Sequence, residues 1–519
     1  MANKSLFSSA MAKVLPRTDT VNEAGGQAYA YGPEALLAQL AATGTLSDGF
    51  YADAQAQLTK ALGAAWAVDA EWVAKCAIYS RRSGAMKDMP ALLTAVLSMS
   101  DPDLMVPVFR RVIDNGRMLR NFVQIMRSGQ TGRSSLGSRP KRLVREWLEN
   151  ASTRQLMQAA TGKDPSLADI VKMVHPAPAS AERRAFYGWL IGKPYDVAAL
   201  PKEIADFEAW KADRSRPLPD VPFEWLTAFD LTAKQWAVLA ERIGWQALRM
   251  NLNTLARKGV FQIDGVTEMV AARLADPDAI ARVKPMPYQL TTALTQVGDG
   301  VPLAVQAALE KALDLSLAKV PMLEGNVVVC PDVSGSMGSP ATGYRRSATS
   351  VVRCIDIAAL VSAAMLRSNP QTRVLPFEVD VVKLKLDPKA RVAVNAAKLA
   401  GVGGGGTNVS APLALLNRER AMVDTVVIVS DNQSWVDPAR HGATATMREW
   451  NRLKARNSGA KLICIDIQPY GSTQAKDRKD IMNVGGFTDA VFDAMARFAN
   501  GDAKDWVEIV NEVEIVETK

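Results

Sequence analysis

Hard oxygen ligands gather in three separate segments in the second half of this 519-residue chain. The segments are Asp332-Val333-Ser334-Gly335-Ser336, the glycine-rich stretch 403–408 (GGGGTN) and Ser430-Asp431-Asn432. Carboxylates and hydroxyls in that number suit Mg²⁺. Zinc is not expected, because the chain has only two histidines and four dispersed cysteines, without CxxC or HxxxH spacing. The predicted metal ligands are Asp332, Ser334, Ser336, Thr407 and Asp431.

Apolar, β-branched runs directly precede the first and third segments, at 326–330 (NVVVC) and 425–429 (TVVIV). Further strands are expected at 373–377, 381–384 and 461–467, and helices near 348–367, 410–416, 444–454 and 489–499. Strands that are apolar throughout and alternate with helices predict a doubly wound α/β domain with a buried parallel sheet. Ligands of such domains bind at the carboxyl ends of the strands, so the three segments are expected to converge there.

The DxSxS pattern, a distant Thr and a later Asp after a strand resemble the metal-ion-dependent adhesion site (MIDAS) of the von Willebrand factor A (vWA) family. The resemblance implies that Ser334, Ser336 and Thr407 approach the metal directly or through water. It also implies that Asp332 and Asp431 hold the metal, partly through waters, and that one position stays open for an acidic residue or phosphate of a partner. The alternative is a metal-free A domain that keeps these residues by descent or for helix capping.

Positive charge is concentrated in the first half of the chain. The net charge is +8, and residues 110–154 alone hold eleven basic and three acidic residues, ten of the eleven being arginine. Arginine offers a planar fork to phosphate and stacks on bases, so a one-sided patch on a neutral background predicts nucleic-acid binding. The alternative is a set of solvated helix faces, although these normally mix the two signs.

Residues 20–320 show apolar residues at helical spacing, separated by short polar or Pro/Gly breaks, and no convincing alternating strands. This pattern predicts an all-α solenoid of stacked helix pairs. The expected organisation is therefore a flexible N-terminus at 1–19, a helical domain at 20–320 and the vWA-like domain at 321–519.

Four segments of the helical half stand out: the opening around Gly25, Gly26 and Tyr31, the stretch 74–80 (AKCAIYS), the basic stretch from 126 to 142 and the stretch 167–176 (LADIVKMVHP). In this order they resemble the TROVE domain of the Ro autoantigen family and its bacterial orthologues. The resemblance implies a ring of HEAT-like helix pairs with a central hole, closed against the A domain. It further implies binding of small Y RNAs on the outer surface and of single-stranded 3′ ends of misfolded RNA in the hole.

The predicted RNA contacts are Arg117, Arg120, Arg127, Arg133, Lys141, Arg142, Lys172 and His175. For His175 a buried core position and an RNA contact are equally open. Gln158 and Gly162 stand where Ro proteins carry basic residues that help to bind Y RNA, which puts the strength or geometry of Y RNA binding in doubt.

The function expected from these patterns is that of an RNA-binding ribonucleoprotein scaffold without catalysis, acting in RNA quality control or processing. One alternative is a protein-interaction scaffold whose metal site binds an acidic partner residue, and a weaker one is a metal-dependent nuclease. A protein partner such as an exoribonuclease is expected at the A domain. The lack of a signal peptide and of long apolar runs predicts a cytoplasmic protein without a membrane span. A monomer is expected.

Overall fold

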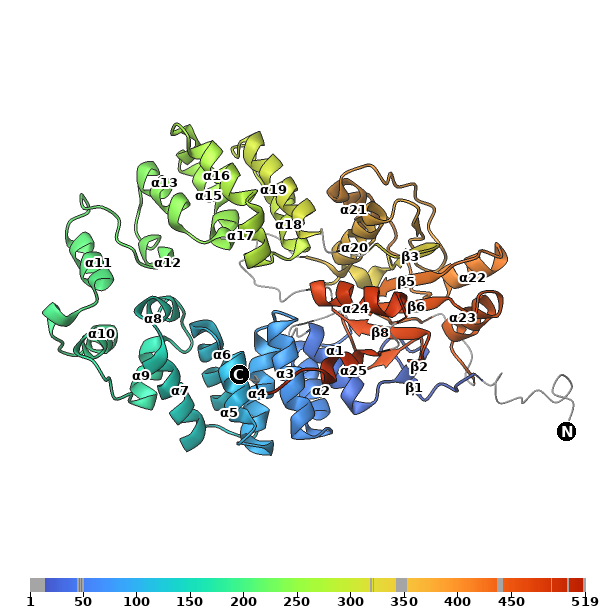
Figure 1. Ribbon diagram of the computed structural model, residues 1–519, viewed down its shortest axis with the longest axis horizontal. Coiled ribbons are helices and arrows are strands. Elements are labelled where there is room, and N and C mark those ends of the chain that lie inside the picture. Colours follow the sequence, from blue (N-terminus) through green and yellow to red (C-terminus); the bar gives the residue numbers. More distant parts are fainter. Residues whose placement is uncertain are drawn as a thin grey trace, which may run out of the picture. The chain divides into compact units, whose positions relative to one another are not determined.

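The chain folds into two compact units (Figure 1). The computed structural model describes residues 15–43, 46, 48, 51–317, 320, 322–341, 352–435, 442–486, 488–501 and 504–516. One unit, here the α/β unit, comprises the described residues up to Val68 and those from 320 to 513. The other, the helical unit, comprises residues 69–317 together with 514–516.

A five-stranded parallel sheet forms the centre of the α/β unit. Its strand order is β4-β3-β5-β6-β8. The strands are β3 (Val327–Pro331), β4 (Arg373–Val374), β5 (Thr425–Ser430), β6 (Lys461–Asp466) and β8 (Ile481–Gly485). Every residue of β3 and β5 is buried, as the unbroken apolar runs predict for strands covered on both faces. The register pairs Val327 with Thr425 and Thr425 with Lys461.

Helices cover both faces of this sheet. They are α20 (Cys354–Ser368), α21 (Val392–Ala400), α22 (Ala411–Arg418), α23 (Ala445–Arg456), α24 (Asp489–Ala499) and α25 (Trp506–Asn511). One core cluster joins Leu413 of α22 and Trp450 of α23 to alternate strand residues such as Val426 and Ile428. Helix α20 also contacts β3 and β5, yet none of its residues belongs to that cluster, so it packs on the opposite face. The predicted doubly wound α/β fold is confirmed.

Residues near the beginning of the chain also belong to the α/β unit. Strands β1 (Thr20–Val21) and β2 (Gln27–Ala30) form a small sheet with β7 (Ser472–Thr473), and α1 (Pro33–Thr43) and α2 (Ala54–Trp66) follow. Helix α1 packs against β8 and α25. The side-chain amide of Gln39 donates a 3.0 Å hydrogen bond to the Asn483 carbonyl. Residues 20–68 were expected in the helical domain but belong to the α/β unit. The expected boundary between the helical and the vWA-like domain, at 321, lies next to the end of the helical unit.

The helical unit contains helices only, within the residues that the structure describes, and successive helices lie beside one another in chain order (Figure 1). They are α3 (Ala70–Arg82), α4 (Asp88–Ser100), α5 (Met105–Val112), α6 (Gly116–Arg127), α7 (Ser138–Asn150), α8 (Thr153–Ala159), α9 (Leu167–Val174), α10 (Ala181–Ile191), α11 (Lys202–Ala212), α12 (Phe223–Leu226), α13 (Ala233–Arg242), α14 (Trp245–Met250), α15 (Leu252–Arg257), α16 (Val266–Leu274), α17 (Pro277–Val283), α18 (Pro287–Gln296) and α19 (Leu303–Ser316). The predicted all-α class of this half is confirmed. Closure of a ring against the A domain stays a prediction.

Helix α6 illustrates how the sequence forms these elements. The Asn115 side chain accepts hydrogen bonds from the backbone N–H groups of Arg117 and Met118 and so caps the helix N-terminus. Met118, Phe122 and other apolar residues at helical spacing are buried, which leaves the arginines on the outer face. No described helix of the chain is long and apolar enough to cross a membrane.

Candidate metal site and basic surface

The three polar segments of the α/β unit meet at the carboxyl edge of the sheet. The Ser430 hydroxyl donates a 2.6 Å hydrogen bond to Oδ2 of Asp332, which joins the first segment to the third. The Gly335 backbone N–H donates to the Gly405 carbonyl at 2.8 Å, which joins the first segment to the second. The hydroxyl of Ser434, two residues after the third segment, donates to the Thr407 carbonyl at 3.3 Å and so links the third segment to the second.

A glycine is required where the second segment crosses the first. Gly403 has φ +90°, and a Cβ atom there would lie 2.1 Å from the Val333 carbonyl oxygen. The Gly404 backbone N–H donates to that same oxygen at 2.8 Å. The glycine-rich stretch therefore allows a close backbone approach that no residue with a side chain permits.

All five predicted ligands are buried, with relative exposures of 0% for Asp332, 2% for Ser334 and Thr407, 5% for Ser336 and 1% for Asp431. The hydroxyls of Ser334 and Ser336 lie 3.3 Å apart. Ser336 lies in a short 3-10 turn, Gly335–Gly338, that follows directly after Asp332 and Ser334. The structure thus brings together the segments that carry these residues.

The electrostatics of this edge fit a hard divalent cation. Burial raises the pKa of both the Asp332 and the Asp431 carboxyls, and the charge of Asp332 raises the pKa of Asp431 further. Among the described residues only hydroxyl and backbone groups bond to these carboxylates, and no Lys or Arg side chain does. Two neighbouring buried carboxylates without a cationic partner are costly, and a metal ion removes that cost.

The ligand set would be mixed. Within the described part of the chain, no group of three or more His, Cys, Asp or Glu side chains is arranged to hold a metal. Asp332 and Asp431 would hold Mg²⁺ together with the hydroxyls of Ser334, Ser336 and Thr407, as the resemblance to the MIDAS pattern implies, with waters completing the shell.

A third buried carboxylate at this edge was not predicted. Asp466 ends β6, pairs in register with Ser430 and is 1% exposed. Burial, and next the charge of Asp431, raise its pKa well above the usual value. Its Oδ1 accepts a hydrogen bond from the Gln468 backbone at 3.1 Å, and its Oδ2 is buried without a hydrogen-bond partner among the described residues. The sequence could have indicated Asp466, because it follows an apolar strand run just as Asp332 and Asp431 do.

Part of the predicted RNA-contact set faces solvent. Arg117 and Arg127 are exposed on α6, Arg142 is exposed on α7 and Lys172 is exposed on α9. None of these four forms an ion pair within the described residues. Lys141 on α7 is half-buried. Helix α9 contacts α6 and α7, so these cations belong to neighbouring helices.

His175 is exposed, so the alternative of a buried core position is wrong. It forms the C-cap of α9 in the left-handed conformation, with φ 50°, and its backbone N–H donates to the Val171 carbonyl at 3.0 Å. Arg145 of α7 donates to the Val174 carbonyl at 2.5 Å and fixes the end of α9 next to this histidine.

Two of the predicted RNA-contacting residues, Arg133 and Arg120, form hydrogen bonds within the helical unit. The Arg133 guanidinium donates to the Ser98 carbonyl at 2.9 Å and to Sδ of Met99 at 3.0 Å. The Arg120 guanidinium donates to the Ala159 carbonyl and is half-buried. Burial, and then the charge of Arg117, lower its pKa from the usual value.

The guanidinium of Arg120 occupies the space beside Gly162, where the resemblance implies a basic side chain. A Cβ atom at Gly162 would lie 2.0 Å from Cζ of that guanidinium. The cation therefore reaches the position from α6 rather than from residue 162 itself.

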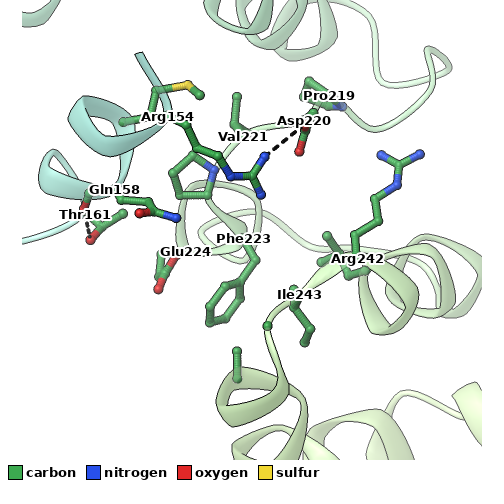
Figure 2. A pocket seen from close by; sticks show the side chains of 15 residues that line it. Arg154, Gln158, Thr161, Pro219, Asp220, Val221, Phe223, Glu224, Arg242 and Ile243 are labelled. Atoms are coloured by element: carbon green, nitrogen blue, oxygen red, sulfur yellow. Dashed lines mark hydrogen bonds and ion pairs between the residues drawn. The ribbon is translucent and has the colours of Figure 1, made fainter. Parts of the chain in front are cut away.

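Gln158 lines a pocket of about 340 Å³ between α8 and the segment that leads into α12 and α13 (Figure 2). Figure 2 shows Arg154 beside Gln158 and reaching Asp220, with which it forms an ion pair at 3.2 Å. Phe223 and Arg242 also line this pocket. Gln158 therefore lies in a pocket of mixed polar and apolar lining, and two arginines, Arg154 and Arg242, are among the lining residues.

Comparisons with known proteins agree with this architecture. Residues 326–499 match the family model described as the Ro60 vWA domain. A protein of Deinococcus radiodurans named RNA-binding protein RO60 is 25% identical, over 93% of this chain and 95% of its own length. The crystal structure of the Deinococcus radiodurans Ro (RSR) protein matches 91% of this chain and 100% of its own length, with 23% identity and a TM-score of 0.62.

The α/β unit is thus a vWA domain, joined in one chain to a unit of stacked helices. Over 91% of the chain the fold is similar to that of the Deinococcus radiodurans Ro (RSR) protein.

Proposed function

We propose that this chain is an RNA-binding scaffold without catalytic chemistry, which binds small Y-like noncoding RNA and single-stranded 3′ ends of misfolded RNA. The observation that carries the proposal is the set of exposed, unpaired cations on α6, α7 and α9 of the described residues. The relative from Deinococcus radiodurans is named an RNA-binding protein, which supports the same function.

The spacing of the cations on α6 suits a phosphate backbone. Arg117 and Arg127 are ten residues apart, which corresponds to roughly 15 Å along a helix axis. Lys172, exposed on the adjoining helix α9, adds a further charge, whereas Arg120 between them is bonded to the Ala159 carbonyl. Such a row contacts several phosphates, while specificity comes from loops, ends and stacking.

We also propose that the edge formed by Asp332 and Asp431 binds Mg²⁺. The buried, uncompensated carboxylates and the neighbouring hydroxyls support this proposal. Bound Mg²⁺ would supply positive charge between the carboxylates, while the protein's own hydrogen bonds hold the three segments in register.

Fluorescence anisotropy with a labelled RNA hairpin that carries a single-stranded 3′ tail tests the RNA proposal. We expect binding that weakens steeply as salt rises, because cations on the protein release counterions from phosphates. We expect the double variant Lys141→Glu, Arg142→Glu to lose most of its affinity. Lys193→Glu with Lys234→Glu is the matched control, since both lysines are exposed on the same unit outside the basic segment.

Salt-independent binding, or full affinity of the Lys141, Arg142 variant, would overturn the proposal. The alternatives are further outcomes of this experiment. RNA cleavage in Mg²⁺ that is abolished by Asp332→Ala would indicate a nuclease, and absence of RNA binding would favour a scaffold for acidic proteins.

A further inference from the structure

The pocket of about 340 Å³ beside α8 has walls that are linked by defined contacts (Figure 2). Arg154 of α8 forms an ion pair at 3.2 Å with Asp220, in the segment that leads into α12. The guanidinium of Arg242, the last residue of α13, donates to the Leu218 carbonyl of the same segment at 3.1 Å. The segment is therefore tied to a helix on either side, and the pocket volume lies in the range of roughly 300–1,000 Å³ in which proteins bind small organic groups.

Apolar side chains line much of this pocket. Met157, Leu239 and Ile243 are buried, and Phe223, the first residue of α12, is half-buried. Figure 2 shows the Phe223 ring among the lining side chains. Aromatic rings stack on the unpaired bases of single-stranded RNA. The pocket thus offers an aromatic surface between apolar walls.

Two polar side chains of the lining are exposed and have no partner. They are Gln158 of α8 and Glu224 of α12, and neither side chain forms a hydrogen bond or ion pair with a described residue. An amide both donates and accepts hydrogen bonds, whereas a carboxylate accepts them. Together they can bind the edge of a group that carries donors and acceptors side by side.

The charges of the lining cancel. Arg154 and Arg242 contribute two positive charges, and Asp220 and Glu224 contribute two negative ones. A phosphate group needs an excess of cations, which this pocket lacks. A nucleobase is uncharged, with flat apolar faces and hydrogen-bonding groups along its edge. The lining therefore favours a base over a phosphate.

Helix α8 also brings the pocket next to the exposed cations of α6. A Cβ atom at Gly116, the first residue of α6, would lie 2.2 Å from Cβ of Ala159 on α8. Arg117 follows Gly116, and Gln158 precedes Ala159, so a free cation and the edge of the pocket are neighbours. An RNA strand whose phosphate is held by Arg117 can therefore place an adjoining base in the pocket.

We propose that this pocket takes one unstacked base of single-stranded RNA, with the base stacked on Phe223 and its edge bound by Gln158 and Glu224. The inference rests on the proposed binding of RNA and adds a base-specific contact to it. A base with an exocyclic amino group is favoured, because the carboxylate of Glu224 accepts a hydrogen bond that uracil has no amino group to donate.

Anisotropy titrations of the full chain with labelled RNA hairpins that carry a single-stranded adenosine tail test this inference. In each hairpin a different tail nucleotide lacks its base. We expect one position at which the missing base lowers the affinity by about fivefold to 150-fold, as for loss of one stacked base. Uridine at that position should lower the affinity by about fivefold, as for loss of one hydrogen bond.

Variants of the lining connect that position to the pocket. Phe223→Leu, and Gln158→Ala together with Glu224→Ala, should bind the intact RNA more weakly and should no longer respond to the missing base. Phe223→Tyr, which keeps an aromatic ring, should respond like the unmodified chain. Gln262→Ala with Glu268→Ala is the control, because both residues are exposed on the helical unit outside the pocket. Circular dichroism melts of each variant show whether the fold is kept.

A scan in which no missing base alters the affinity would overturn the inference, as would an undiminished response in the Phe223→Leu variant. Equal affinities for adenosine and uridine at the sensitive position would overturn the role of Glu224. A flat scan together with binding of free adenosine that Phe223→Leu abolishes would assign the pocket to free nucleosides instead. Absence of any RNA binding by the unmodified chain would overturn the proposed function itself.

Discussion

Removal of two exposed arginines from α6 would test most directly how the helical unit contacts RNA. The change is Arg117→Gln together with Arg127→Gln. Both side chains are exposed and unpaired within the described residues, so their loss leaves the packing of the helix unaltered. The control is Arg110→Gln together with Arg139→Gln, which changes the net charge equally. Each control arginine already has a carboxylate partner at 2.8 Å.

The expected magnitude follows from counterion release. Each phosphate contact with single-stranded nucleic acid contributes about 0.7 to the slope of log affinity against log salt, so two lost contacts lower the slope by about 1.4. Between about 50 and 200 mM salt, the ratio of unmodified to variant affinity then shrinks by about sevenfold. The control should keep the slope of the unmodified chain, because its arginines are neutralised locally by Glu146 and Asp103.

The assay is a salt series of anisotropy titrations with the tailed RNA hairpin, repeated for both double variants. The comparison between equally charged variants separates direct phosphate contact from the general field of the protein. Equal slopes for the unmodified chain and the α6 variant would refute the reasoning. A greater loss of slope in the control would place the RNA elsewhere on the unit.

Three further predictions concern stability. In thermal melts, Mg²⁺ at a hundredfold excess over Kd should stabilise the unmodified chain by about 2.7 kcal/mol. Asp332→Asn should abolish this stabilisation, and an undiminished rise in the melting temperature of the variant would contradict the prediction. Gly26→Ala should destabilise the α/β unit by about 1–3 kcal/mol in urea titrations, because its Cβ would meet a backbone carbonyl. Gly32→Ala, where the Cβ meets nothing within 4 Å, is the control and should unfold like the unmodified chain. Arg133→Ala should lower the unfolding free energy of the helical unit by about 1 kcal/mol, because the hydrogen bond to the Ser98 carbonyl near the end of α4 is lost. Arg142→Ala, at an exposed position, should lower it little. Equal unfolding free energies of the two variants would contradict that distinction.

The sequence was sufficient for the parts of the fold that depend on local patterns. The runs NVVVC and TVVIV become β3 and β5 almost residue for residue, because unbroken β-branched runs are typical of strands buried on both faces. Convergence of the segments at Asp332, Thr407 and Asp431 followed from the common edge at which parallel strands end.

Other elements carried too weak a local signal. Strand β8 was missed because its five residues (IMNVG) include Asn483, whose side chain binds within the unit. The expected strand at 381–384 is absent, and only an isolated bridge joins Phe377 and Val381. Part of the helix expected at 348–367 lies outside the described residues, and α20 begins at Cys354.

Contacts between distant parts of the chain could not be predicted from any window of sequence. The hydrogen bond from Asn22 to Ser434 joins residues 412 positions apart, and the local sequence around neither residue predicts it. Charge counting likewise could not distinguish Arg133, which holds a carbonyl, from Arg142, which faces solvent. Composition shows that cations are present, and only packing decides which of them remain free.

The α/β unit is built from both sides of an inserted helical unit, and this has a consequence for synthesis of the protein. At about 5–20 residues per second, roughly 20–80 s separate translation of Asn22 from that of Ser434. Residues 69–317 are complete within that interval and can fold while β2 and α1 still lack the strands that bury them. The sheet edge that carries Asp332 and Asp431 is therefore among the last parts of the molecule to form, after the helices of the helical unit already exist.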